Sequence, residues 1–299
     1  MPNFRCIVAA TDLSECSERA ARRAARIAQQ HHAEMHLLHV VRPLDLYAGL
    51  TLGPDEFGQH DQDLQHEEQS RVDAMASSLS GEFGIRIHPV TRLGRAHTEI
   101  AAYAQSVSAD LVVAGARGES TLMDLIMGST ASRLLRLAAC PVLIVRKPAD
   151  APYRRVLAAV DFSPVTASVV SHALSLAGGA TVEALHVLGS EVEQRLRRAK
   201  LAQLDVTDWL ARRRTEAGAQ LDSLLGPITE NETVIRLIEP GVPPAAICQR
   251  IEDHEAELVV LGRHGHGAGL QEWMLGSVSK DVAFAAGCDV LLIGPGGSA

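Results

Sequence analysis

The segment GARGESTLMDLIMGST combines three glycines with two hydroxyl residues, and such groups can hold an anion. Gly115 and Gly118 lie close together, while Gly128 precedes Ser129 and Thr130. Glycine lets backbone N–H groups approach a phosphate closely, and the start of a helix stabilises negative charge. The segment has neither the G-x-G-x-x-G of dinucleotide sites nor the lysine of a Walker loop. Its spacing alone therefore fits two interpretations, a phosphate site and a plain turn followed by a capped helix.

A carboxylate near the start of the chain could face this segment. Asp12 follows an apolar run and precedes Ser14, a residue type that begins helices. A second Asp, Asp161, is followed by Ser163 and Pro164, which by themselves are a good helix start. We therefore expect the serines to cap the helices and the two aspartates to accept hydrogen bonds from a ligand.

The second half of the chain repeats blocks of the first half in the same order. CIVAATDLS returns as VLAAVDFS, LVVAGARG returns as LVVLGRHG, and MGSTASRLLRLAACPVLIV returns as LGSVSKDVAFAAGCDVLLI. The repeat pairs the following positions: Asp12 with Asp161, His39 with His186, Gly115 with Gly262, Gly118 with Gly265, and Gly128 with Gly276. We predict two copies of one domain, over residues 1–148 and 153–296, joined at the proline-containing segment RKPADAPYR.

Composition and charge narrow the class of protein. The 299 residues are 46% hydrophobic and 21% charged, which is typical of a globular chain that can bury two cores. The net charge of -8 argues against attraction to nucleic acid or to an anionic membrane, so neither is expected as a partner. The cysteines form no C-x-x-C pair, and no apolar run approaches the roughly 18 residues of a membrane span. With no signal peptide recognisable at the N-terminus, we expect a cytoplasmic protein.

Short apolar runs alternate with longer helical patterns. The strands predicted in the first copy are residues 6–10, 35–41, 85–90, 111–115 and 142–145. This alternation is typical of a parallel sheet with helices on both faces, the doubly wound α/β class. Ligands of such sheets bind beyond the carboxyl ends of the strands, where the strand order reverses. Asp12 ends the first strand and Gly115 the fourth, so they would meet in that crevice if the two strands are neighbours.

The 13 histidines invite a search for a metal site. His36 and His39 are three apart in a predicted strand, so their side chains point to opposite faces of the sheet. His264 and His266 flank a glycine with no third ligand in view. We therefore predict no zinc site in the chain.

The glycine segment also matches a family signature. Gly115 and Gly118, nine further residues, and then Gly128 and Ser129 fit the pattern G-x-x-G-x9-G-[ST]. This pattern resembles the ATP-binding signature of the universal stress protein family. The strand that ends in Asp, LHV in the second strand and CPVLIV as the fifth are similar to that family too. The resemblance covers almost the whole chain, as a tandem pair of universal stress protein domains, and is weakest after the second strand of each copy.

The resemblance implies a five-stranded parallel sheet in each domain, with strand order 3-2-1-4-5. In ATP-binding members the Asp after strand one and the backbone of the valine in HV hold adenosine, while the glycine loop and the next serine hold the phosphates. In the first copy the binding residues would be Asp12, Val40, Gly115, Gly118, Gly128, Ser129 and Thr130. In the second copy they would be Asp161, Val187, Gly262, Gly265, Gly276 and Ser277. Mg²⁺ would be carried by the ATP itself.

The second copy departs from the signature. Ten residues, HGAGLQEWML, separate Gly265 from Gly276, where the signature has nine. Gly267 and Gly269 could absorb the extra residue through conformations closed to other residues, or they could weaken the site. The first site keeps the family spacing and is expected to be the stronger one.

The resemblance implies an ATP-binding regulator of the stress response without efficient turnover. The chemistry agrees, because no carboxylate, histidine or lysine has a fixed place in the signature where it could position water or a leaving group. Two alternatives stay open: an enzyme that hydrolyses ATP or transfers adenylyl groups, and a protein-interaction module in which one or both nucleotide pockets are vestigial. Family members commonly pair through strand five. We therefore expect pairing of the two domains within the chain, a homodimer of the tandem, and an unidentified protein partner.

Overall fold

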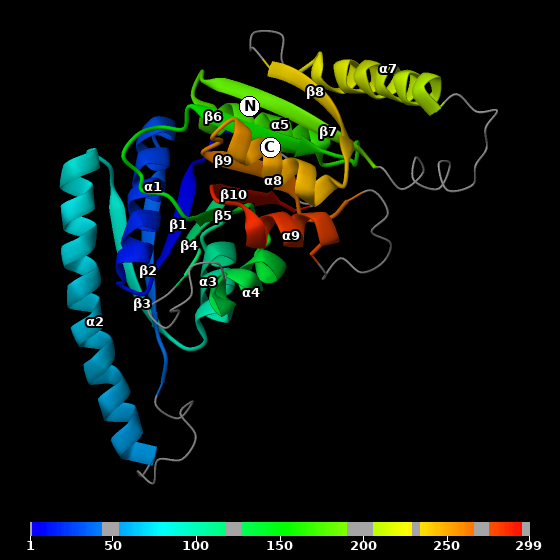
Figure 1. Ribbon diagram of the computed structural model, residues 1–299. Helices are drawn as coiled ribbons and strands as arrows, with labels where there is room; N and C mark the ends of the chain where they lie inside the picture. Colours follow the sequence, from blue (N-terminus) through cyan, green and yellow to red (C-terminus); the bar gives the residue numbers. More distant parts are fainter. Residues whose placement is uncertain are drawn as a thin grey trace. The chain divides into compact units, whose positions relative to one another are not determined.

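The computed structural model describes residues 2–43, 54–117, 127–189, 206–228, 234–265 and 275–294. The chain divides into two compact units, Asn3–Ala151 and Pro152–Ala299 together with Met1–Pro2. In Figure 1 the first unit runs from blue to green and the second from green to red. Each unit contains its own parallel sheet and its own helices.

The sheet of the first domain has the predicted strand order. Its strands are β1 (Cys6–Thr11), β2 (Glu34–Val41), β3 (Ile87–Leu93), β4 (Leu111–Gly115) and β5 (Val142–Val145). Neighbouring strands are parallel and follow one another as β3-β2-β1-β4-β5. The central strands are buried on both faces, which explains why their sequences are continuous apolar runs. The doubly wound fold class is thereby confirmed.

One strand of the first domain lies away from its predicted place. The apolar pattern placed it at residues 85–90, whereas β3 covers Ile87–Leu93. β3 pairs with β2 and forms an edge of the domain's own sheet. An edge strand tolerates Pro89, which has no N–H to donate. Because β3 is only half-buried for most of its length, its boundaries leave a weak trace in the sequence.

The second domain repeats this architecture. Its strands are β6 (Arg155–Val160), β7 (Thr181–Gly189), β8 (Val234–Gly241), β9 (Leu258–Gly262) and β10 (Asp289–Ile293). They are parallel and follow one another as β8-β7-β6-β9-β10. In both domains the order therefore reverses between the first strand and the fourth, the place where such sheets bind ligands.

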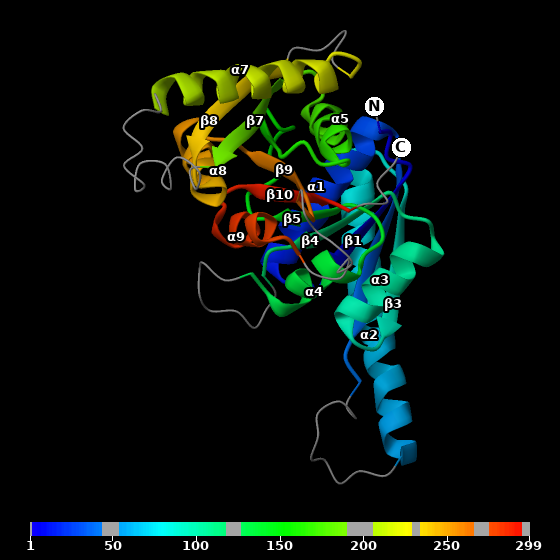
Figure 2. The ribbon, with the colours of Figure 1, turned by 90° about the vertical axis from the view of Figure 1, so that its right-hand side faces the viewer.

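Helices connect the strands of each sheet. Those of the first domain are α1 (Glu15–His31), α2 (Pro54–Phe83), α3 (Ala96–Ser106) and α4 (Ser129–Leu137). Those of the second domain are α5 (Thr166–Ala177), α7 (Val206–Leu225), α8 (Pro243–Asp253) and α9 (Ser277–Ala285). In the first domain α1 contacts α2 and α3 contacts α4, and Figure 2 shows the second of these pairs together. Among the helices of the described segments, none combines the length and the apolar character needed to cross a bilayer.

The first helix of each domain begins differently. Ser14 caps α1, and its hydroxyl oxygen accepts a hydrogen bond from the backbone N–H of Ser17, as predicted. In the second domain the prediction that Ser163 caps the helix is wrong. α5 begins two residues later, at Thr166, with Val165 as the cap residue, and the backbone N–H of Thr166 bonds to the carbonyl oxygen of Ser163 at 3.0 Å.

Candidate functional site

The predicted residues of the first domain surround one cavity. β1 and β4 are neighbours, so Asp12 and Gly115 follow adjacent strands at the carboxyl edge of the sheet. Here lies a cavity of about 290 Å³. Its lining includes the predicted residues Asp12, Val40, Gly115, Gly128, Ser129 and Thr130. Gly118, with the rest of residues 118–126, lies outside the described residues.

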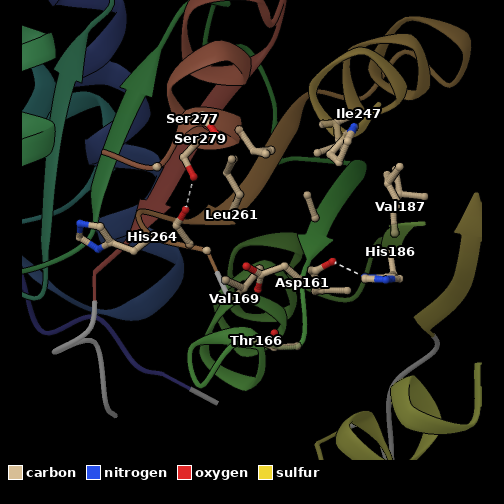
Figure 3. Close-up of a pocket in the computed structure, with 18 residues that line it drawn as sticks. Asp161, Thr166, Val169, His186, Val187, Ile247, Leu261, His264, Ser277 and Ser279 are labelled. Atoms are coloured by element: carbon tan, nitrogen blue, oxygen red, sulfur yellow. Dashed lines mark hydrogen bonds between the residues drawn. The ribbon is translucent and has the colours of Figure 1, made fainter. Parts of the chain in front are cut away.

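The matching place in the second domain holds a larger cavity, of about 450 Å³. This volume is within the range of small-molecule sites. Its lining includes all six predicted residues, namely Asp161, Val187, Gly262, Gly265, Gly276 and Ser277. Figure 3 shows Asp161 and Thr166 on one side of this cavity and Ser277 and Ser279 on another. Residues 266–274, which hold most of the longer loop, lie outside the described residues.

Each aspartate already takes part in a local turn. Oδ1 of Asp12 accepts hydrogen bonds from the backbone N–H and the hydroxyl of Ser14. Oδ1 of Asp161 accepts one from the backbone N–H of Ser163 at 3.0 Å. The expectation that serine capping leaves the whole carboxylate to a ligand is therefore wrong for this oxygen. The turn fixes the carboxylate at the strand end, which favours its role as an oriented acceptor.

The fourth strand of each domain ends in a glycine, and close contacts explain why no side chain fits there. A Cβ on Gly115 would lie 3.1 Å from the carbonyl oxygens of Cys16 and Arg117. A Cβ on Gly262 would lie 2.7 Å from a methyl group of Val165. Only glycine therefore lets the first helix pack this close to the strand end. The steric role explains these glycines whether or not a ligand is bound.

Gly128 and Gly276 directly precede helices α4 and α9, and each forms a backbone hydrogen bond to the turn that follows the fourth strand of its domain. The N–H of Gly128 donates to the carbonyl oxygen of Ala116, and the N–H of Gly276 donates to that of Arg263, both at 2.8 Å. These two glycine N–H groups are therefore not available to a phosphate. The N–H groups of the first helical turn, which begins at Ser129 and Ser277, remain the donors for an anion.

A further glycine brings the second loop over the carboxylate. A Cβ on Gly265 would lie 3.0 Å from Oδ2 of Asp161. The turn after β9 therefore stands directly beside the acid that follows β6, with no room for a side chain between them. The carboxylate of Asp161 and the turn that contains Gly265 together form one wall of the cavity.

The histidine of each LHV motif joins the second strand to the first. Nδ1–H of His39 donates to the carbonyl oxygen of Thr11, and Nδ1–H of His186 donates to that of Val160, both at 2.9 Å. Burial lowers the pKa of His186, although its bond to Val160 and the charge of Asp161 act in the opposite direction. These bonds hold the residue just before each aspartate. Sequence reasoning considered His39 only as a possible metal ligand and missed this role.

The remaining cavity walls were not predicted. Pro243 and Ile247 of α8 line the second cavity, and Ala96 and Ile100 of α3 line the first. Their signal in the sequence is the helical spacing of apolar residues, which does not by itself distinguish a cavity wall from core. Thr166 also lines the second cavity. It is 1% exposed, and its hydroxyl has no hydrogen-bond partner within the described segments of the chain.

The fold and the site define a class: a tandem α/β protein with a cavity at the strand ends of each domain. The sequence pattern of the universal stress protein family matches residues 3–146 and 152–294. The chain therefore belongs to the universal stress protein family, as the glycine signature predicted.

Individual relatives agree with this assignment. A universal stress protein of Mycolicibacterium smegmatis is 29% identical over 310 residues, which cover 97% of each chain. A universal stress protein of Methanocaldococcus jannaschii is 32% identical over 145 residues, which cover 48% of this chain and 84% of the relative. The crystal structure of a universal stress protein from Archaeoglobus fulgidus has the same fold, with a TM-score of 0.68 at 21% identity over 97% of this chain and 98% of that one.

Proposed function

We propose that both domains bind ATP and that the chain is a nucleotide-dependent regulator of the stress response. One observation carries the proposal. In each domain a carboxylate, a glycine turn and the first turn of a helix surround the same cavity at the switch point of the sheet. Phosphate is stabilised at a helix start, and a ribose hydroxyl is a natural donor to a carboxylate.

The residues present fit an adenine nucleotide. The first-turn amides and hydroxyls of Ser129 and Thr130, and of Ser277 in the second domain, would donate to phosphate oxygens. Asp12 and Asp161 would accept from the ribose, and the backbone of Val40 and Val187 would hold the base, as the family resemblance implies. The unpartnered hydroxyl of Thr166 supports a polar ligand in the second cavity, because a buried hydroxyl without a partner is unfavourable.

A magnesium ion would enter with the nucleotide. The only carboxylate among the described residues of the first cavity lining is Asp12, and the only one in the second is Asp161. Mg²⁺ needs one or two carboxylates at most when phosphate oxygens and water complete its shell. Such an ion would neutralise charge on the phosphates.

The two sites differ in a way that bears on their relative strength. The second cavity is the larger, although its loop exceeds the family spacing by one residue. A predominantly apolar wall that includes Leu185, Ile247 and Leu261 favours a base or another flat apolar group there. We therefore propose that the second domain binds nucleotide as well, and that the longer loop alters affinity rather than abolishing binding.

We propose that the protein acts as a regulator and does not hydrolyse ATP efficiently. In the described lining of the first cavity, the only carboxylate accepts two hydrogen bonds from Ser14 through Oδ1, an arrangement that suits holding a ligand more than activating water. Under the alternative, an enzyme that hydrolyses ATP or transfers adenylyl groups, purified protein would release ADP or AMP steadily.

The test is mass analysis of the small molecules released when purified full-length protein is denatured, immediately and after long incubation with ATP and Mg²⁺. The proposal expects adenine nucleotide in the first sample and intact ATP in the second. Steady accumulation of ADP or AMP would replace the regulator with an enzyme. Protein that neither carries nor takes up nucleotide would replace it with an interaction module.

Assembly and location complete the proposal. We propose cytoplasmic residence, a homodimer of the tandem, pairing of the two domains through their fifth strands, and domain bounds of 1–148 and 153–296. Light scattering of the purified chain tests the dimer, and limited proteolysis near RKPADAPYR tests the bounds. A chain that scatters as a monomer at all concentrations would remove the dimer from the proposal.

A further inference from the structure

Three side chains in the first domain gather away from the nucleotide cavity. Glu34 and His36 lie two residues apart on β2, so they point to the same face of the sheet. His88 lies on β3 and is the register partner of His36. In a parallel sheet such partners share a face, so the edge of the sheet brings a carboxylate and two imidazoles together.

The three side chains are close enough to one another to be candidate metal ligands. One ligand atom from each of Glu34, His36 and His88 lies within 4.8 Å of the others. The two imidazole rings are stacked, with centroids 4.8 Å apart and 24° between their planes. Tetrahedral bonds of about 2.1 Å separate ligand atoms by roughly 3.4 Å, so metal binding would require the imidazole rings and the exposed Glu34 side chain to rotate toward one another.

The partners of the two histidines favour metal binding. Nε2 of His88 is buried and has no hydrogen-bond partner among the residues that the structure describes. Oε2 of Glu34 lies 3.9 Å away, beyond hydrogen-bond distance. Nδ1 of His36 lies 2.8 Å from the hydroxyl of Tyr103. When Nδ1–H donates to this hydroxyl, Nε2 carries the lone pair that a metal requires. Such an outer partner is the usual companion of a metal-binding histidine.

The second domain offers a comparison within the same chain. The position that matches His36 is Glu183, and its register partner on β8 is Ile235. Arg250 takes the place of Tyr103 and binds Glu183 with two hydrogen bonds of 2.9 Å. The repeat therefore replaces the imidazole cluster by an ion pair. A metal site is expected once per chain, in the first domain.

We propose that Glu34, His36 and His88 form a binding site for a divalent transition metal of the zinc type. Two imidazoles and one carboxylate suit zinc and its neighbours better than Mg²⁺ or Ca²⁺, which prefer oxygen alone. Three protein ligands leave a position for water, and the exposure of Glu34 provides an entry path. The expectation from sequence that the chain has no zinc site considered His36 with His39, because the pairing with His88 depends on the register of β3.

Both positively and negatively charged groups lie near the proposed metal site. The Arg92 guanidinium lies 4.8 Å from the centre of the Tyr103 ring. Cys6 is the register partner of Glu34 on β1. Burial, and then the charges of Asp110 and Glu34, raise the pKa of the Cys6 thiol. The nearby carboxylates favour a cation, whereas Arg92 opposes it.

The test is a Zn²⁺ titration of full-length, nucleotide-free protein against a chromophoric chelator, with thermal unfolding recorded in parallel. We expect one zinc ion per chain and a rise in Tm with zinc, because a ligand bound only by the folded state stabilises it. His88→Ala should weaken binding at least about tenfold, and Tyr103→Phe should weaken it by about 10-fold to 100-fold. Glu34→Gln changes an exposed side chain, so it tests the site even if His88→Ala unfolds.

A matched control comes from the second domain. Nδ1 of His254 lies 3.9 Å from Oε1 of Glu183, the same separation as in the His88 and Glu34 pair, but no second histidine joins it among the residues described there. His254→Ala should leave zinc affinity and the zinc-dependent Tm unchanged. The proposal is overturned if wild-type protein fails to outcompete the chelator. It is equally overturned if His88→Ala and Glu34→Gln bind zinc as tightly as the wild type.

Discussion

The backbone N–H of Gly276 donates a 2.8 Å hydrogen bond to the carbonyl oxygen of Arg263. This bond ties the start of α9 to the turn after β9 and so sets the distance between the two parts of the site. The N–H of Arg263 in turn bonds to the carbonyl oxygen of Ile293 at the end of β10. Arg263 itself is 5% exposed and packs beside Gly294, so its side chain has a structural place outside the cavity lining.

Replacing Gly276 by alanine tests this closure. Its φ of -59° suits any residue, but the new Cβ would lie 3.2 Å from the oxygen of Arg263 and 3.5 Å from the nitrogen of Gly265. Because both neighbours are backbone atoms, we expect Gly276→Ala to lower the free energy of unfolding by about 1 kcal/mol. Nucleotide bound by the second domain should fall as well. Denaturant unfolding and nucleotide titration measure the two effects.

Gly287→Ala is the matched control, because a Cβ there would have no atom within 4 Å. It should leave stability and nucleotide binding unchanged. Equal behaviour of the two alanine variants would contradict the steric account of Gly276.

Thr166→Val tests whether the cavity is built for a polar ligand. Valine has nearly the same shape as threonine and removes the buried hydroxyl that has no partner. Without nucleotide the variant should be at least as stable as the wild type, because an unsatisfied buried hydroxyl is unfavourable. If the hydroxyl binds the nucleotide, affinity of the second site should fall about fivefold, equivalent to about 1 kcal/mol.

Thr91→Val is the control for this substitution. The Thr91 hydroxyl is also buried without a hydrogen-bond partner, but Thr91 is absent from the described cavity linings. It should affect stability alone. Unaltered nucleotide affinity in both variants would mean that Thr166 does not contact the ligand.

The stability of the second domain should decrease in mild acid. Burial lowers the pKa of His172, although its 2.7 Å bond to the carbonyl oxygen of Ser168 raises it in part. The unfolded chain therefore binds a proton that the folded chain does not, in the window between the lowered pKa and the ordinary value near 6.5. The stabilisation is complete above this window and is lost as the pH falls through it.

His172→Leu should reduce the loss of unfolding free energy between neutral pH and about pH 5.5. Other histidines with lowered pKa values, such as His36, His97 and His186, contribute their own loss, so the difference between variant and wild type is the quantity to compare. His254→Leu, which removes an exposed imidazole, provides the control for the substitution itself. Parallel pH profiles for wild type and His172→Leu would refute the argument.

The sequence predicted correctly those features that depend on the pattern of neighbouring residues. The bounds of β4 and β5 follow from continuous apolar runs, and the repeat located the matching aspartates and glycines in both domains. Features that depend on the folded backbone have no comparable pattern in the sequence. The start of α5 at Thr166 and the glycine amide bonds depend on backbone geometry that several sequences allow.

The histidine cluster illustrates the same limit. His36 and His88 are far apart in the chain, and their contact requires the register of β3 against β2. Pro89 and the half-buried edge weaken the pattern that would have fixed this register. The walls supplied by α3 and α8 were equally invisible, because an apolar helical stripe has the same sequence pattern over a cavity as over a core.

The most direct test of the central claim is an equilibrium titration of ATP with Mg²⁺ into nucleotide-free, full-length protein, which counts sites per chain. Asp12→Asn and Asp161→Asn are the suitable variants, since an amide oxygen can still accept the bonds from Ser14 and Ser163 while the charge is lost. Loss of a charged hydrogen bond should weaken the altered site by about tenfold or more. The account predicts two sites in the wild type, one site of wild-type affinity and one weakened site in each single variant, and two weakened sites in the double variant. A wild-type protein that binds no ATP, or variants that keep both sites at full affinity, would contradict it.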